Sequence, residues 1–198
     1  MPEETAVYQL RGCVMDAVTE NIKVMMGRIK VLIVDDEYYT RKVIRTLLLA
    51  MGCTKIYEAN DGTAGLDAIR GLTPDIVLLD WEMPGIDGAA FVRRVRSPQT
   101  FPVPHVPIIM LTGHGERSRV LEAVRLGVHE FLLKPVSSSA LQARMLSVLT
   151  KPRPMVKRGD YYGPEPRKLA SYKPETDGYG SDVGSAEDRS PRHMIFVN

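Results

Sequence analysis

Three uninterrupted apolar runs constrain the fold of this chain more than any other feature of its sequence. They lie at residues 31–34 (VLIV), 76–79 (IVLL) and 108–111 (IIML). Runs without alternation are typical of strands that are buried on both faces, as in a parallel sheet with helices on either side. Weaker strand signals lie at residues 55–59 and 130–133.

Apolar stripes at helical spacing separate these strands. Gly52 and Gly127 follow the first and fourth stripes, and Asp61 stands near the start of the second, in positions typical of helix ends. This order of strand and helix predicts an α/β fold with right-handed crossovers. The stripes are Ile44, Leu47, Leu48 and Met51; Leu66 and Ile69; Phe91, Val92 and Val95; Val120, Ala123 and Val124; and Leu141, Met145, Val148 and Leu149.

The pattern divides the chain into a leader (1–28), a periodic core (29–150) and a tail (151–198). Apolar residues of the leader recur at helical spacing, which predicts a short amphipathic helix packed on the core. The alternative is that Met25 or Met26 is the true start of translation. The tail holds six Pro and five Gly and lacks apolar periodicity, so we expect it to be disordered.

The net charge, the length of the apolar runs and the number of cysteines indicate which partners and which cellular compartment to expect. The net charge of +2 argues against nucleic acid as a partner. No apolar run approaches the roughly 20 residues that span a bilayer, so membrane insertion is not expected. Two cysteines without metal-ligand spacing fit a cytoplasmic location.

Polar residues follow four of the five expected strands. Asp35 and Asp36 end the first strand, Asp80 the third, Thr112 the fourth and Lys134 the fifth. In an open parallel sheet, ligands bind beyond the carboxyl ends of the strands. Three carboxylates gathered there repel one another unless a hard cation such as Mg²⁺ joins them. The set therefore predicts a site that places a phosphoryl group on a carboxylate, with Asp80 as the nucleophile.

Four segments in order resemble the receiver domain of response regulators of the CheY-like type. They are residues 31–37 (VLIVDDE), 79–85 (LDWEMPG), 111–113 (LTG) and 131–135 (FLLKP). The resemblance covers residues 29–150 and is specific because all four segments are present at the expected spacing. It implies a flavodoxin-like, doubly wound (βα)5 parallel sheet with strand order 2-1-3-4-5, the order of CheY-like receivers.

The resemblance also assigns the metal site and the acceptor. It implies that Asp80 is the phosphoacceptor. It further implies that Asp36, assisted by Asp35, holds Mg²⁺ together with Asp80 and the backbone carbonyl of Glu82.

The remaining site residues receive their roles in the same way. Lys134 would pair with the phosphoryl group, and its bond to Pro135 would be cis. Thr112 would move to hydrogen-bond the phosphoryl group, and Phe131 would be the aromatic switch residue. His114 and Glu82 occupy positions that tune phosphoryl hydrolysis in receivers.

The function implied is that of a single-domain response regulator, a signalling protein and not an enzyme. A histidine kinase or a histidine phosphotransfer protein would donate the phosphoryl group, and a conformational switch would act on a downstream protein. One alternative is that the tail, whose first part is basic, is the output segment and binds nucleic acid or a partner. Another is a phosphatase or flavoprotein on the same fold, but Glu82 and the acidic residues after the first strand do not match those sites.

Structural roles are the alternative for each residue of the site. Asp35 and Asp36 could cap the first helix, Thr112 could be a turn residue, and Phe131 could belong to the core. Two further residues carry no functional signal. We expect Arg96 on a solvated helix face and His129 in a surface loop.

Overall fold

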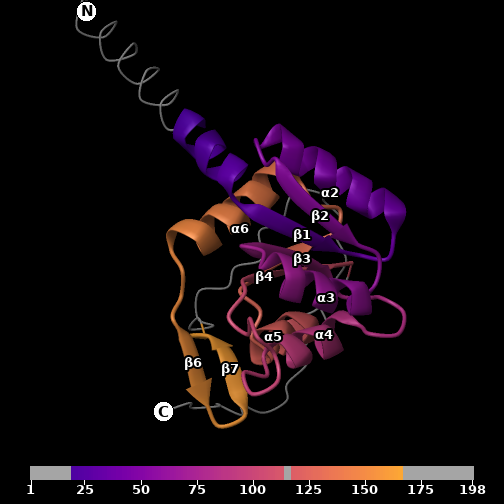
Figure 1. The fold of residues 1–198 in the computed structure, drawn as a ribbon, viewed down its shortest axis with the longest axis vertical. Coiled ribbons are helices and arrows are strands. Elements are labelled where there is room, and N and C mark those ends of the chain that lie inside the picture. The colour runs from indigo at the N-terminus through magenta and orange to yellow at the C-terminus, as the bar shows by residue number, and fades with distance from the viewer. Residues whose placement is uncertain (1–18, 114–116, 167–198) are drawn as a thin grey trace, which may run out of the picture. The chain divides into compact units, whose positions relative to one another are not determined.

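A computed structural model describes residues 19–113 and 117–166, and these form a five-stranded parallel sheet with helices on both faces. The strand order is β2-β1-β3-β4-β5, of which Figure 1 labels the first four strands, so the predicted fold class and order are confirmed. The strands are β1 (Lys30–Val34), β2 (Lys55–Ala59), β3 (Ile76–Asp80), β4 (Ile108–Thr112) and β5 (Glu130–Leu133), and the helices are α2 (Tyr38–Ala50), α3 (Gly62–Leu72), α4 (Gly88–Val95), α5 (Arg117–Leu126) and α6 (Ser138–Thr150).

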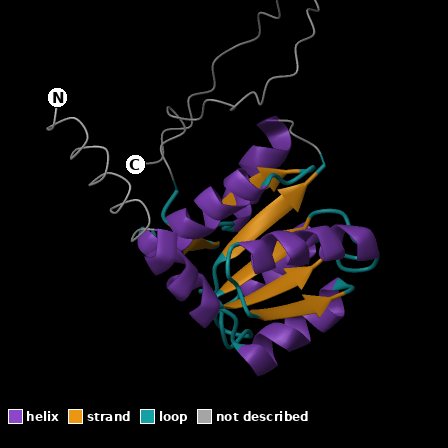
Figure 2. Cartoon of the chain, turned by 90° about the horizontal axis from the view of Figure 1, so that it is seen from above, coloured by secondary structure: helices purple, strands orange, loops and turns teal. Residues whose placement is uncertain are grey.

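Two hydrophobic cores lie on opposite faces of this sheet. Helices α3, α4 and α5 cover one face, where Leu32 and Val34 of β1 pack. Helices α2 and α6 cover the other face, where Val31 and Ile33 pack. Figure 2 shows the strands between the two layers of helices. Because neighbouring residues of β1 enter different cores, its apolar run is continuous, as the sequence predicted.

Side-chain caps and left-handed residues fix the ends of several helices. Asp61 accepts a hydrogen bond from the backbone N–H of Ala64 at 2.8 Å, which begins α3. Gly52 and Gly127 have positive φ angles of 94° and 87° after α2 and α5. The predicted helix ends therefore lie where the sequence placed them.

The described part of the leader is a helix over residues 19–28 that packs on the receiver-like core. Met26 is fully buried, and Ile22 and Met25 are partly buried against the same core as α2 and α6. The hydroxyl of Thr54 donates a hydrogen bond to the carbonyl of Gly27 at 3.0 Å. Residues 1–18, where the rest of the expected amphipathic helix falls, lie outside the described residues.

The structure differs from the expected disordered tail over residues 151–166, which we call the C-terminal hairpin segment. Here β6 (Met155–Arg158) pairs antiparallel with β7 (Tyr161–Pro164). The two-residue turn Gly159-Asp160 joins them, with φ +58° at the glycine, and Gly-Asp between strand-forming residues is a hairpin signal. The high Pro and Gly content masked this signal. Residues 167–198 lie outside the described residues.

The expected surface positions of Arg96 and His129 are wrong. Arg96 is 6% exposed and donates to the carbonyls of Gly127 (2.9 Å) and Pro104 (2.6 Å), and its Nη2 lies 3.3 Å from Nδ1 of His129. Burial lowers the pKa of Arg96 to about 10, so the guanidinium stays charged at neutral pH. Burial, with the charges of Arg96 and Arg153, lowers the pKa of His129 to about 3, so this ring is neutral. Three backbone segments thus meet at one buried cation.

Candidate functional site

The polar residues that follow the strands meet at the carboxyl edge of the sheet. Asp35 follows β1, Asp80 and Thr112 end β3 and β4, and Lys134 follows β5. The parallel register aligns these ends, with Val34 opposite Leu79. The sheet order, which places β1 and β3 side by side, therefore brings the carboxylates together as predicted.

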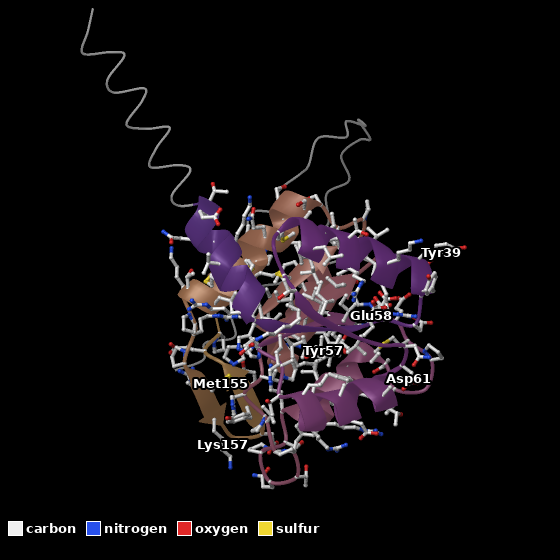
Figure 3. All side chains as sticks on the ribbon, turned by 45° about the horizontal axis from the view of Figure 1, so that its top comes forward. Tyr39, Tyr57, Glu58, Asp61, Met155 and Lys157 are labelled. Atoms are coloured by element: carbon white, nitrogen blue, oxygen red, sulfur yellow. The ribbon has the colours of Figure 1, made fainter. Side chains whose placement is uncertain are left out.

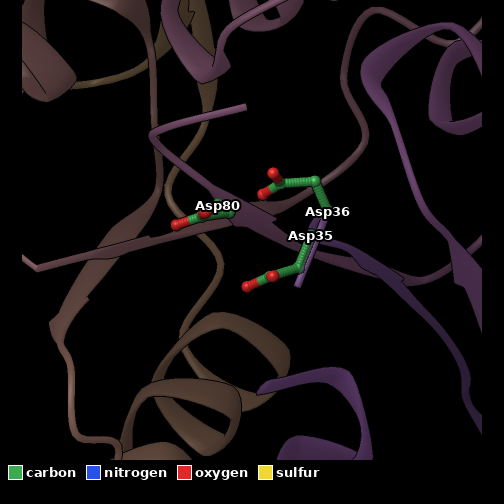
Figure 4. A group of neighbouring side chains, drawn as sticks. All are labelled: Asp35, Asp36 and Asp80. Atoms are coloured by element: carbon green, nitrogen blue, oxygen red, sulfur yellow. The ribbon is translucent and has the colours of Figure 1, made fainter. Parts of the chain in front are cut away.

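Three carboxylates form a compact group at this edge (Figure 4). One oxygen from each of Asp35, Asp36 and Asp80 lies within 4.8 Å of the others. Asp35 is fully buried, Asp80 is 6% exposed, and Asp36 is exposed. The group therefore has a buried floor and one side that is open to solvent.

Lys134 neutralises part of this negative charge. Its ammonium lies 2.8 Å from Oδ1 of Asp80 and 2.9 Å from Oδ2 of Asp35. Burial alone would lower the pKa of Lys134, but the two ion pairs raise it, so the ammonium is charged. Burial raises the pKa of Asp80, and Lys134 opposes this shift. The two directions are compatible, because for Asp80 the cost of burial exceeds the gain from the ion pair.

Backbone N–H groups orient the buried carboxylates. Oδ1 of Asp35 accepts from Glu37 at 2.8 Å, and Oδ1 of Asp80 accepts from Trp81 at 2.9 Å. Asp35 thus has two roles: it binds the backbone at the start of α2, and it belongs to the carboxylate group. The residue at the N-cap of α2 is Glu37, whose side chain makes no capping hydrogen bond.

The carboxylate group fits a magnesium ion. Mg²⁺ takes oxygen ligands at about 2.0–2.1 Å, so two ligands on opposite sides of the ion are about 4.2 Å apart. The three oxygens lie within 4.8 Å of one another, so small side-chain adjustments would let them share one ion. An exposed Asp36 also leaves room for the water ligands that Mg²⁺ retains.

The other predicted site residues lie around this group. Thr112 is 4% exposed at the end of β4, next to β5, and the backbone N–H of Lys134 donates to its carbonyl at 2.8 Å. Phe131 is half-buried against the core under α3, α4 and α5. Oε1 of Glu82 lies 4.0 Å from Nη2 of Arg119. The Lys134–Pro135 bond is cis, as expected, and His114 lies outside the described residues.

Sequence reasoning missed Arg119, a residue of α5 beside the acceptor strand. Its guanidinium lies 5.2 Å from the ring centroid of Trp81, the residue after Asp80. Arg119, Trp81 and Glu82 line an open pocket of about 460 Å³ together with Met83, Pro84 and Asp87. No sequence motif predicts the contact between Arg119 and Trp81, because it depends on how α5 packs against the loop after β3.

Comparisons with known proteins agree with this geometry. Residues 31–146 match the family model of the response regulator receiver domain. The chain is 33% identical over 122 residues to the chemotaxis protein CheY of Pseudomonas aeruginosa, covering 62% of this chain and 97% of that one. It is 32% identical over 170 residues to the phosphate regulon transcriptional regulatory protein PhoB of the same organism, covering 83% and 71%.

A solved structure gives the same result. The chain is similar to a chain in the CheX–CheY–BeF3–Mg²⁺ complex from Borrelia burgdorferi, with a TM-score of 0.57 and 27% identity, covering 62% of this chain and 90% of that one. Two described segments of the present chain, the helix at residues 19–28 and the C-terminal hairpin segment, lie outside the family match. Within the described residues, no helix is both long and apolar enough to cross a membrane.

Proposed function

Because the chain belongs to the response regulator receiver family of two-component systems, we propose that it accepts a phosphoryl group on Asp80 and signals through protein contacts. The observation that carries this proposal is the pairing of the Asp80 carboxylate with Lys134 inside a group of three carboxylates. The receiver occupies residues 29–150. Members of this family are signalling proteins, so the chemistry that we propose is limited to the gain and loss of one phosphoryl group.

The transfer is a displacement at phosphorus. A carboxylate oxygen of Asp80 attacks the phosphorus of a phosphohistidine on a histidine kinase or phosphotransfer protein. The P–O bond to Asp80 forms as the P–N bond breaks, and the imidazole nitrogen keeps the electron pair. The product is an acyl phosphate on Asp80. When water attacks its phosphorus, the bond from phosphorus to the Asp80 oxygen breaks, inorganic phosphate leaves and the carboxylate is restored.

The neighbouring side chains supply charge and position. Asp35, Asp36 and the backbone carbonyl of Glu82 would hold Mg²⁺ with Asp80, and this ion would neutralise charge on the phosphoryl oxygens. Lys134, whose ammonium is already 2.8 Å from Asp80, pairs with a phosphoryl oxygen that the ion does not contact.

The same step sets the conformational switch. The hydroxyl of Thr112 turns to the new phosphoryl group. Phe131, which is half-buried on the neighbouring strand β5 opposite Met110, follows into the space that Thr112 leaves. The phosphoryl group thereby favours one of two arrangements of α5, β5 and α6.

An exposed apolar patch beside the site supports a protein as the phosphoryl donor. Tyr38, Tyr39 and Val43 are 59%, 73% and 56% exposed. They lie in the first two turns of α2, directly after the carboxylates at the end of β1. Large exposed apolar residues gathered at one place mark contact surfaces.

A titration tests the metal site. We expect Mg²⁺ to change the fluorescence of the buried Trp81 in a saturable way, and beryllofluoride to bind only when Mg²⁺ is present. Asp36→Asn removes one ligand charge and should weaken Mg²⁺ binding at least about tenfold. The matched control is Asp160→Asn, an exposed carboxylate in the hairpin turn. A wild-type protein that ignores Mg²⁺, or an Asp36→Asn variant with unchanged affinity, would contradict the proposal.

Replacement of Lys134 by methionine should change two affinities in opposite directions. The ammonium repels Mg²⁺ from Asp80 and Asp35, so its loss should tighten Mg²⁺ binding about tenfold. The ammonium also pairs with the phosphoryl mimic, so beryllofluoride should bind about 100-fold more weakly, a change of about 2.7 kcal/mol. Both affinities are read from Trp81 fluorescence.

The control for this variant is Lys42→Met, which removes an exposed lysine of α2. It should leave both affinities within about twofold of wild type. Parallel changes of the two affinities in Lys134→Met, in either direction, would show that the side chain only maintains the fold of the site.

A further inference from the structure

The C-terminal hairpin segment contacts the junction between α5 and β5. Gly163 of β7 lies against Gly127, the residue after α5, so closely that a Cβ atom at Gly163 would lie 2.6 Å from the Cα of Gly127. A Cβ atom at Gly127 would lie 2.8 Å from the carbonyl oxygen of Tyr162. Two backbones are thus in direct contact, which only glycine at both positions allows.

Arg153 fastens the base of the hairpin to the same junction. Its guanidinium donates to the carbonyl of His129, the residue before β5, and to the carbonyl of Glu165 at 2.8 Å. The backbone N–H of Glu165 in turn donates to the carbonyl of Pro154 at 2.8 Å. One side chain therefore ties both ends of the hairpin to the start of β5. Figure 1 shows β6 and β7 beside the end of the receiver that holds α5.

Helix α5 connects this contact to the phosphoacceptor. Arg119, near its start, lies over the ring of Trp81, which follows Asp80. Its last residue, Leu126, precedes Gly127 under the hairpin. The helix has 10 residues and is about 15 Å long, and continuous helical hydrogen bonding links its two ends. A shift at the Arg119 end therefore has to be accommodated at the Gly127 end.

We propose that the C-terminal hairpin segment is an autoinhibitory contact, which holds the α5–β5 junction in the arrangement where the Asp80 carboxylate pairs with Lys134. This inference rests on the proposed function of Asp80. The contacts at Gly127 and His129 stabilise that arrangement of α5, so phosphorylation has to weaken them. Because coupling between two sites is reciprocal, loss of the hairpin contacts must increase affinity for a phosphoryl group by the same factor.

The C-terminal hairpin segment lies beyond the residues that the receiver family model matches. The family match ends at residue 146, and the chemotaxis relative is covered over 97% of its length by 122 residues of this chain. The hairpin therefore lies outside the receiver family match, and it contacts an element of the receiver that we propose to switch.

Two variants test the inference in the full chain. Gly163→Val puts a branched side chain into the space held by Gly127 and the Tyr161 hydroxyl, which lies 2.6 Å from the Cβ position. Arg153→Ala removes the side-chain hydrogen bonds to the carbonyls of His129 and Glu165 and adds no bulk. The control is Lys157→Ala, an exposed residue of β6 labelled in Figure 3.

The readout is beryllofluoride affinity at saturating Mg²⁺, followed by Trp81 fluorescence, with urea unfolding to check that each variant is folded. Gly163→Val and Arg153→Ala should bind the mimic at least about fivefold more tightly than wild type, the lower end of typical coupling factors. Lys157→Ala should match wild type. If Gly163→Val is unfolded, the beryllofluoride affinity of Arg153→Ala tests the inference alone.

A second measurement follows the contact itself. In wild type, beryllofluoride should increase amide hydrogen exchange at Gly127 and Gly163, since the mimic weakens their contact. Unchanged or weaker mimic affinity in folded Arg153→Ala would overturn the autoinhibitory role while leaving phosphorylation of Asp80 intact. A wild-type protein that does not bind the mimic would instead defeat the proposed function.

Discussion

Asp80→Asn is expected to lose phosphorylation by acetyl phosphate completely, a fall of more than about 1,000-fold in rate. The amide keeps the size of the carboxylate and accepts the hydrogen bond from the Trp81 backbone, so the fold should persist. The amide oxygen is not a nucleophile, and the acyl phosphate cannot form. The measurement is mobility on a phosphate-affinity gel after incubation with Mg²⁺ and acetyl phosphate.

The pH dependence of the wild-type reaction has a defined sign. Burial raises the pKa of Asp80, and only the ionised carboxylate attacks phosphorus. The rate should therefore fall as the pH drops through this raised pKa, and bound Mg²⁺ should shift the fall to lower pH because it favours the charged form.

Asp160→Asn is the matched control for the acceptor, since it removes a carboxylate from the exposed hairpin turn. It should be labelled at the wild-type rate. A labelled adduct that persists in Asp80→Asn, or one that mass spectrometry places on Asp35 or Asp36, would remove Asp80 from the role of acceptor.

The sheet and the carboxylate group could be predicted because short-range signals determine both. The strand at residues 76–79 is buried on both faces, and its sequence contains no polar residue that would favour an exposed position. Its apolar run therefore indicates a buried strand. The end of each strand is then fixed to within one residue. Once the strands are parallel, Asp35 and Asp80 must lie at the same edge of the sheet.

The contacts of Arg96, Arg119 and the hairpin could not be predicted in this way. Each depends on how elements far apart in the chain meet. Arg96 follows two exposed arginines on α4 and shares their composition signal, but it alone reaches Gly127, 31 residues later. Within the hairpin, Gly159-Asp160 is a local signal that could have been found. The contact between Gly163 and Gly127 is tertiary, and no local sequence pattern predicts it.

Arg96→Ala is expected to destabilise the protein by about 3–5 kcal/mol, the largest effect on stability that we predict. The change removes the donor from the buried carbonyl of Gly127 and from the partly buried carbonyl of Pro104. Each buried acceptor without a partner costs about 1–3 kcal/mol. The free energy of unfolding is measured by urea titration, and the m-value should stay unchanged.

Two variants separate the buried network from a general effect of charge. Arg94→Ala removes an exposed arginine from the same helix and should cost about 0.5 kcal/mol or less. Arg96→Lys keeps the charge, but an ammonium cannot reach both carbonyls and the His129 ring as a planar guanidinium does, so it should recover only part of the loss. Equal losses in Arg96→Ala and Arg94→Ala would mean that hydrogen bonding at the α5–β5 junction contributes nothing. The hairpin would then rest on a junction that is held by apolar packing alone.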